Sequence, residues 1–303
     1  MMKATPLKYC LLLLLFFSCA PQAKKAAEAV PAEERHYSMP EVPTTLREPA
    51  ARAEYVVTHY WERFDFNDPS LEHDTIFMEQ AFVDYAAILP LANESIATAS
   101  IRQLLQQTER TTAGTRLMEL AKHYLGHPES PIRNEATYVL FLKEYAALPS
   151  TPLADRERSS YMAKQLSKNS VGSLAADFSY TDRNGGKSSL YQTESELTLL
   201  FFYNPDCENC HRLLTAISQN GLPIGNDRLK VLAVYADSDT SLWQSSQQPI
   251  PDGWIDVHSP EISSKQLYYI PATPSLYLLD KDKHVLLKDA QPDILVQELT
   301  KRR

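Results

Sequence analysis

Residues 197–214 read Leu-Thr-Leu-Leu-Phe-Phe-Tyr-Asn-Pro-Asp-Cys-Glu-Asn-Cys-His-Arg-Leu-Leu. The unbroken apolar run Leu199–Tyr203 predicts a β-strand that is buried on both faces, as in a parallel sheet. An Asn-Pro-Asp segment then predicts a turn, and the apolar residues beyond Cys210 recur at helical spacing. The sequence therefore places Cys207 where a strand passes into the N-terminus of a helix.

This position favours thiol–disulfide chemistry. Free backbone N–H groups and the helix dipole stabilise a thiolate at a helix N-terminus. Cys210 follows three residues later, within one helical turn, so it can attack a mixed disulfide formed at Cys207. We predict that Cys207 and Cys210 are the catalytic pair and that their redox-active disulfide takes the place of a cofactor or metal.

The same letters admit three other interpretations. Cys207-Glu-Asn-Cys-His211 also matches the attachment pattern of c-type haem, which would need a pocket and usually a second axial ligand. All six Met residues precede the motif, so none follows it as a ready axial ligand. A zinc site lacks a second Cys pair. A purely structural disulfide is the third alternative.

Length and charge limit the class of protein. A chain of 303 residues has room for about two domains. The apolar fraction of 44% is enough for ordinary globular cores. The net charge is −8 and no long basic stretch is present, so we expect no nucleic-acid partner.

The N-terminus has the features of an export signal. Lysines precede an apolar run at residues 11–17, which is too short to span a bilayer but typical of a signal peptide. The Ser18-Cys19 pair that follows resembles a bacterial lipobox, which would make Cys19 the lipid-modified first residue of the mature protein. Ordinary cleavage after Ala20 is the alternative. We therefore expect a lipid anchor in a membrane of the bacterial cell envelope, with the protein facing the periplasm.

Four segments follow from these patterns: a lipoprotein signal peptide at 1–19, a disordered tether at 20–46, an all-α domain at 47–169 and an α/β domain at 170–303. The tether is rich in Ala, Pro, Glu and Lys and has no apolar periodicity. The third segment shows apolar residues at helical spacing, including one stretch that runs from Ala53 to Phe64, and predicts five or six helices.

The last segment alternates strands and helices. Asn184-Gly185-Gly186 predicts a hairpin turn between short strands at 177–180 and 188–191. The remaining elements are expected as strands at 199–203, 230–236, 254–257, 275–279 and 284–287, and as helices from Cys207 and at 241–247, 261–268 and 292–301.

Residues 171–303 resemble the TlpA-type thioredoxin-like thiol–disulfide oxidoreductases, which have an α/β fold. Four pieces match in order: the Val171 to Gly186 hairpin region, the strand and redox motif Leu199–Cys210, the strand Lys230–Asp237, and Ile270-Pro-Ala-Thr-Pro274 with the hairpin after it. The helical domain resembles the extra domain found in some bacterial envelope lipoproteins.

The resemblance implies roles for individual residues. Cys207 would be the attacking cysteine and Cys210 the resolving one. Thr273-Pro274 matches the family's cis-proline step, which would leave the Thr273 backbone free to pair with an extended substrate. The buried acid of thioredoxin proper is Phe201 here, which argues against recognition by thioredoxin's own reductase.

Two charged or titratable neighbours are candidates for tuning the pKa of the nucleophile. The charge of Glu208 would oppose a thiolate at Cys207 and raise its pKa, whereas a protonated His211 would lower it. Either side chain could instead be simply solvated.

Together these features predict a membrane-tethered envelope thiol–disulfide oxidoreductase. It would reduce disulfides of a client protein and be reduced again by a membrane electron donor. The alternatives are an oxidase or isomerase with the same chemistry, and a non-catalytic binding or scaffold lipoprotein with a thioredoxin fold.

Overall fold

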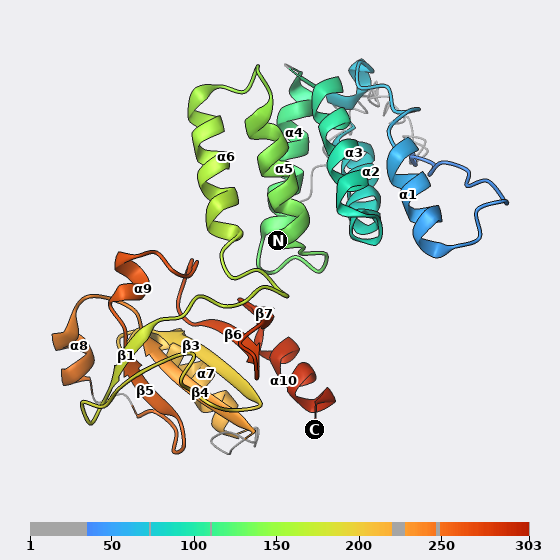
Figure 1. Ribbon diagram of the computed structural model, residues 1–303. Coiled ribbons are helices and arrows are strands. Elements are labelled where there is room, and N and C mark those ends of the chain that lie inside the picture. The colour runs from blue at the N-terminus through green and yellow to red at the C-terminus, as the bar shows by residue number, and fades with distance from the viewer. Residues whose placement is uncertain (1–34, 73, 110, 220–227, 247–248, 303) are drawn as a thin grey trace, which may run out of the picture. The chain divides into compact units, whose positions relative to one another are not determined.

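The computed structural model describes residues 35–302 except 73, 110, 220–227 and 247–248 (Figure 1). The predicted signal peptide, Cys19 and most of the predicted tether lie outside the described residues. Within the described residues, no helix is both long enough and apolar enough to cross a membrane.

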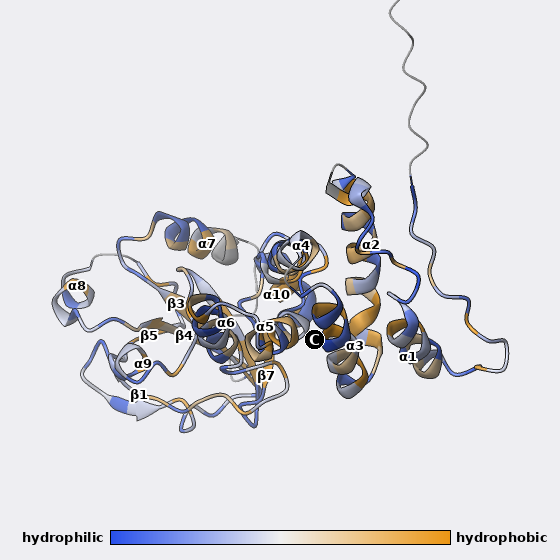
Figure 2. Ribbon diagram, turned by 90° about the horizontal axis from the view of Figure 1, so that it is seen from above, coloured by the Kyte–Doolittle hydropathy of each residue, from blue (hydrophilic) through white to orange (hydrophobic). Residues whose placement is uncertain are grey.

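Helices alone make up the structure up to residue 166, as predicted. Six α-helices are described there, and side chains of Asp74, Asn93, Thr111 and Asn134 cap four of them by accepting backbone N–H groups. Figure 2 shows apolar residues recurring along α2 and α3. The helices are α1 (Pro49–His59), α2 (Thr75–Ile88), α3 (Glu94–Gln107), α4 (Thr112–Leu120), α5 (Glu135–Ala147) and α6 (Leu153–Leu166), with short turns η1 (Pro69–Glu72), η2 (Leu89–Leu91) and η3 (Ala121–Gly126) between them.

The first helix is shorter than its apolar pattern predicts. It ends at His59, but Trp61 and Phe64 beyond it remain buried in the helical core. Tyr37 packs on the same cluster, with its ring 5.1 Å from that of Phe64, and its hydroxyl donates to the Tyr60 carbonyl. The aromatic contacts therefore hold part of the segment at 20–46 that we expected to be a free tether.

The rest of the chain forms a seven-stranded mixed sheet in the order β2-β1-β5-β4-β3-β6-β7. β3 pairs in parallel with β4, and β4 pairs in parallel with β5. On the other side of β3, β6 pairs antiparallel with β3 and with β7. This is the predicted α/β thioredoxin-like architecture. Its strands are β1 (Ser179–Asp182), β2 (Lys187–Ser189), β3 (Leu197–Tyr203), β4 (Leu229–Tyr235), β5 (Ile255–His258), β6 (Ser275–Asp280) and β7 (Val285–Lys288).

The central strand β3 is buried on both faces, as its apolar run predicts. Leu199, Phe201 and Tyr203 pack into one core cluster, while Leu200 and Phe202 pack into the cluster on the opposite face. Successive strand side chains point to opposite faces, so only an unbroken apolar run can fill both cores. This strand leads directly to the redox motif.

Four helices accompany the sheet: α7 (Glu208–Gln219), α8 (Thr240–Ser245), α9 (Glu261–Ser264) and α10 (Pro292–Lys301). The bounds of α10 are those predicted. Helix α9 ends four residues earlier than predicted, because Gln266 adopts a left-handed backbone with φ 51°. Tyr268 then turns into the core and its hydroxyl donates to the Ala176 carbonyl at 2.7 Å.

Contacts cross the boundary that we placed at residue 170. The helical part and the mixed sheet belong to one compact unit, His36–Arg303. Lys288 at the end of β7 donates to the Glu135 carboxylate and to the Leu166 carbonyl, both in the helical part. The redox fold is therefore joined to the helices by specific polar bonds as well as by the chain.

Candidate redox site

Cys207 lies in the turn between β3 and α7, immediately before the first helical residue. The turn is closed by Asn204, whose carbonyl accepts the N–H of Cys207 at 3.0 Å and whose side chain accepts the N–H of Asp206 at 2.9 Å. The predicted position of the cysteine at a strand-to-helix junction is confirmed. A polar turn residue after the apolar strand is what fixes that position.

The two thiols are adjacent and unequal in exposure. Both are free, and the backbone N–H of Cys210 donates to Cys207 Sγ at 3.2 Å. Cys207 is partly exposed, whereas Cys210 is 0% exposed. A disulfide of another protein can therefore reach Cys207, and Cys210 can be reached only through Cys207.

Opposing effects act on the pKa of Cys207. Burial raises it, but hydrogen bonds from the thiol of Cys210, the side chain of Thr273 and the backbone N–H groups of Cys210 and Asn209 lower it more, so the net shift is downward. Burial and the hydrogen bond to Cys207 raise the pKa of Cys210 to about 12. Cys207 is therefore the thiol that ionises first.

The loop before β6 forms the other wall of the site. The peptide bond Thr273-Pro274 is cis, as predicted. The thiol of Cys207 donates to the Thr273 carbonyl at 3.3 Å, and no hydrogen-bond partner of the Thr273 N–H is found in the described part of the chain. The predicted role of Thr273 and Pro274 in binding a substrate backbone stays a prediction, and the free N–H is the group that it requires.

The two candidates for tuning the pKa of Cys207, Glu208 and His211, differ in exposure and in hydrogen bonding. Glu208 is exposed at the start of α7, which fits a solvated side chain. His211 is not simply solvated, because its Nε2 lies 2.8 Å from the Pro205 carbonyl and bonds to it. This bond holds the turn before Cys207, so His211 has a structural partner that the sequence pattern does not reveal. Their influence on the pKa of Cys207 stays a prediction.

A buried carboxylate near the end of β3 escaped the sequence analysis. Asp256 in β5 accepts hydrogen bonds from Tyr203 at 2.7 Å, Trp243 at 3.0 Å and Arg183 at 2.5 Å. Its only sequence signal is an acidic residue inside an otherwise apolar strand. Three donors from separate segments surround the carboxylate, so it fits a structural crosslink between strand ends.

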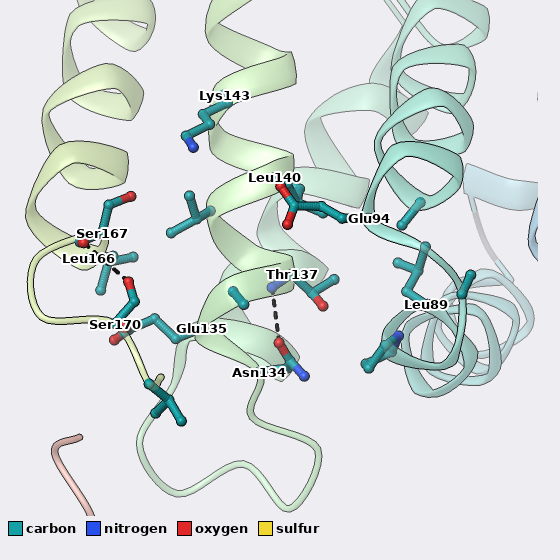
Figure 3. Close-up of a pocket in the computed structure, with 16 residues that line it drawn as sticks. Leu89, Glu94, Asn134, Glu135, Thr137, Leu140, Lys143, Leu166, Ser167 and Ser170 are labelled. Atoms are coloured by element: carbon teal, nitrogen blue, oxygen red, sulfur yellow. Dashed lines mark hydrogen bonds between the residues drawn. The ribbon is translucent and has the colours of Figure 1, made fainter. Parts of the chain in front are cut away.

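Cavities also lie away from the cysteine pair. One of about 650 Å³ is lined by α3, α5 and the end of α6, with the polar residues Glu94, Asn134 and Lys143 around it (Figure 3). Another of about 430 Å³ is bordered by Pro271, two residues before Thr273. No group of three or more His, Cys, Asp or Glu residues that could hold a metal is found within the described ranges.

The side chain of Thr273 offers a direct test of the site's electrostatics. We expect Thr273→Val to raise the pKa of Cys207, because it removes a hydrogen bond that lowers it. Iodoacetamide labelling of the Cys207 peptide, followed by mass spectrometry from pH 5 to 10, should show a higher midpoint for this variant. Thr273→Ser keeps the hydroxyl and is the matched control. Identical profiles for the two variants would contradict this expectation.

Comparison with known proteins adds two family matches. Residues 18–169 match a domain described as "Domain of unknown function (DUF5106)", and residues 171–286 match the AhpC/TSA family. No protein of the curated set matches the sequence.

Solved structures resemble the chain in whole or in part. A thioredoxin-like protein from Bacteroides caccae shares 33% identity over 88% of this chain and 99% of its own, with a TM-score of 0.75. The C-terminal domain of an uncharacterized protein from Bacteroides fragilis shares 37% identity over 44% of this chain and 99% of its own, with a TM-score of 0.42. The thioredoxin domain of a thiol-disulfide oxidoreductase from Bacteroides vulgatus shares 20% identity over 44% of this chain and 97% of its own, with a TM-score of 0.35. The first of these similarities extends across both parts of the chain.

Proposed function

We propose that this chain reduces disulfide bonds of client proteins. The chain belongs to the thioredoxin-like AhpC/TSA family and carries a DUF5106 domain before its redox domain. The observation that carries this proposal is the inequality of the two thiols. Cys207 is accessible and has a lowered pKa, whereas Cys210 is buried and has a raised one. Such a pair can perform two successive thiol exchanges in a fixed order.

In the first step the thiolate of Cys207 attacks a sulfur of the client disulfide. A bond forms between Cys207 and the client, the client S–S bond breaks, and one client sulfur leaves as a thiolate. In this proposal the N–H of Thr273 pairs with the client backbone during the attack. Partial exposure of Cys207 gives the client disulfide access.

In the second step Cys210 loses its proton and attacks the sulfur of Cys207. The Cys207–Cys210 disulfide forms, the mixed disulfide breaks, and the second client thiolate leaves and is protonated. The client gains two electrons and the protein loses two. An external dithiol must supply them again, and we propose a membrane electron donor for this role.

The reducing direction belongs to the proposal. In strong oxidants of this kind the reduced form is specially stabilised. At Cys207 the hydrogen bonds lower the pKa on balance, and burial opposes part of this stabilisation of the thiolate. An oxidase or isomerase, and a scaffold without turnover, are the competing functions. The lipid anchor at Cys19 and the periplasm-facing location in the cell envelope belong to the proposal and rest on the sequence alone.

The reduction potential of the Cys207–Cys210 pair decides among these functions. It is measured on the full chain in detergent, equilibrated against dithiothreitol or glutathione buffers. We expect a value near or below that of thioredoxin, about −270 mV. A value near or above about −180 mV would indicate an oxidase or isomerase. A pair that does not titrate reversibly would favour the scaffold.

A further inference from the structure

The loop around Pro274 needs a fixed position, because its residue Thr273 contacts the nucleophile. Thr273 offers both its carbonyl and its side chain to Cys207. Pro271 and Ala272 just before it are exposed and lie outside any strand. A loop of this kind moves freely unless its ends are tied to the fold.

Ser275 ties this loop at its C-terminal end. It is the first residue of β6 and is 1% exposed. Its Oγ lies 3.0 Å from the Ala272 carbonyl and 3.1 Å from Oδ1 of Asp289. The single hydroxyl proton is shared between these two acceptors, so Ser275 links the turn that contains Thr273 and Pro274 to a carboxylate that follows β7.

Asp289 is held in turn by the helical part of the chain. Arg133 donates from Nη2 to Asp289 Oδ2 at 3.0 Å and from Nη1 to the Asp289 carbonyl at 3.1 Å. Both side chains are mostly covered, with 21% and 18% exposed, so solvent screens the pair less than a surface pair. Two parallel donors also fix direction, which one ammonium group cannot do.

The start of α5 places the arginine. Asn134 caps the helix by accepting the Thr137 N–H at 2.9 Å (Figure 3), and Arg133 directly precedes this cap. Glu135, directly after it, pairs with Lys288 at 2.5 Å. The two residues that flank the cap therefore bind consecutive residues of the redox fold, Lys288 and Asp289.

We propose that Arg133 is a positioning residue of the redox site, which acts through Asp289 and Ser275 on the loop that carries Thr273 and Pro274. The inference rests on the proposed function, in which Cys207 is the nucleophile. It gives the helical domain a role in the reaction without contact between Arg133 and the reacting sulfurs.

Loss of the Arg133 side chain should reduce the thiolate fraction of Cys207. Without Arg133, Asp289 loses its charged partner and is no longer held against Ser275. The loop then leaves its position beside Cys207 for part of the time, and the hydrogen bond from the Thr273 side chain is weakened. The pKa of Cys207 then rises, and we expect labelling at a pH below the midpoint to slow about 3- to 10-fold, because the thiolate fraction there falls tenfold for each unit of pKa.

The test is the pH profile of iodoacetamide labelling at Cys207 in the full chain, read by mass spectrometry. We expect Arg133→Gln and Ser275→Ala each to slow labelling at low pH, and the double variant to slow it no further, since both act on one path. Arg133→Lys should recover part of the loss. Arg102→Gln is the matched control, because Arg102 makes a two-pronged bond to Glu144 within the helical part.

Two results would overturn the proposal. One is an Arg133→Gln profile that superimposes on the wild type, even if the melting temperature falls. The other is a double variant whose effect is the sum of the two single effects. If Arg133→Gln fails to fold, Ser275→Ala carries the test, and an unchanged profile contradicts the link. Labelling of Cys207 does not require reduction of a client. If the wild type reduces no disulfide, the proposed function is wrong, but the labelling profiles still test the role of Arg133.

Discussion

Cys207→Ser should abolish disulfide reduction, whereas Cys210→Ser should stop the reaction after its first step. Cys207 supplies the nucleophile, and no other thiol of the described structure is exposed to replace it. We expect a loss of kcat/KM of about 10³-fold or more from Cys207→Ser. Cys210→Ser keeps the nucleophile but removes the thiol that resolves the mixed disulfide.

The aromatic disulfide 5,5′-dithiobis(2-nitrobenzoate) separates the two variants, because each exchange releases one coloured thiolate. Counts are taken relative to Cys207→Ser, which subtracts the reaction of any other cysteine. The wild type should release two equivalents and retain no label, and Cys210→Ser should release one and retain one. If Cys210→Ser also releases two equivalents without retained label, the assignment of Cys210 as the resolving cysteine is wrong.

The parts of this site that the sequence predicts are those with a local pattern. The apolar run Leu199–Tyr203 predicts a strand buried on both faces, and two cysteines one helical turn apart predict the redox pair. Thr273-Pro274 follows from the order of motifs in a resembling family, and its cis bond is present. The strand and the cysteine pair can each be identified within one short window of sequence, whereas the cis-proline step is identified from its place after the other motifs.

What the sequence does not predict is the pairing of distant side chains. Arg133 and Asp289 are 156 residues apart, and Glu135 and Lys288 are 153 apart. Nothing in the local pattern around α5 distinguishes these charges from a solvated helix start, which favours acidic residues for its own reasons. The packing of Tyr37 is equally hard to predict. It lies in a polar segment, and nothing in that segment indicates that its ring packs against Tyr60 and Phe64.

Glu135→Gln should destabilise the protein strongly, and more at neutral than at alkaline pH. Lys288 is only 3% exposed, and its ammonium donates to Glu135 and to the Leu166 carbonyl, each at 2.5 Å. Removing the partner of a buried charge costs about 3–5 kcal/mol, because the remaining charge stays out of water without compensation. We therefore expect a loss of that order in the free energy of unfolding at pH 7.

The pH dependence follows from the pKa of Lys288. Burial lowers it in the folded protein despite the opposing hydrogen bond and charge of Glu135. The unfolded chain therefore binds more protons, so the free energy of unfolding rises with pH between the folded and unfolded pKa values. Glu135→Gln removes the opposing effect, lowers the folded pKa further and steepens this rise.

Urea unfolding followed by tryptophan fluorescence at pH 7 and pH 9.5, under reducing conditions, measures both effects. Glu144→Gln is the matched control, because its partner Arg102 is 53% exposed and exposed ion pairs contribute little to stability. The control should therefore lose little and show no added pH dependence. A Glu135→Gln variant as mild as the control, or equally destabilised at both pH values, would mean that Lys288 is compensated by groups other than Glu135. The bond between α5 and β7 would then be a minor contribution to holding the helices on the redox fold.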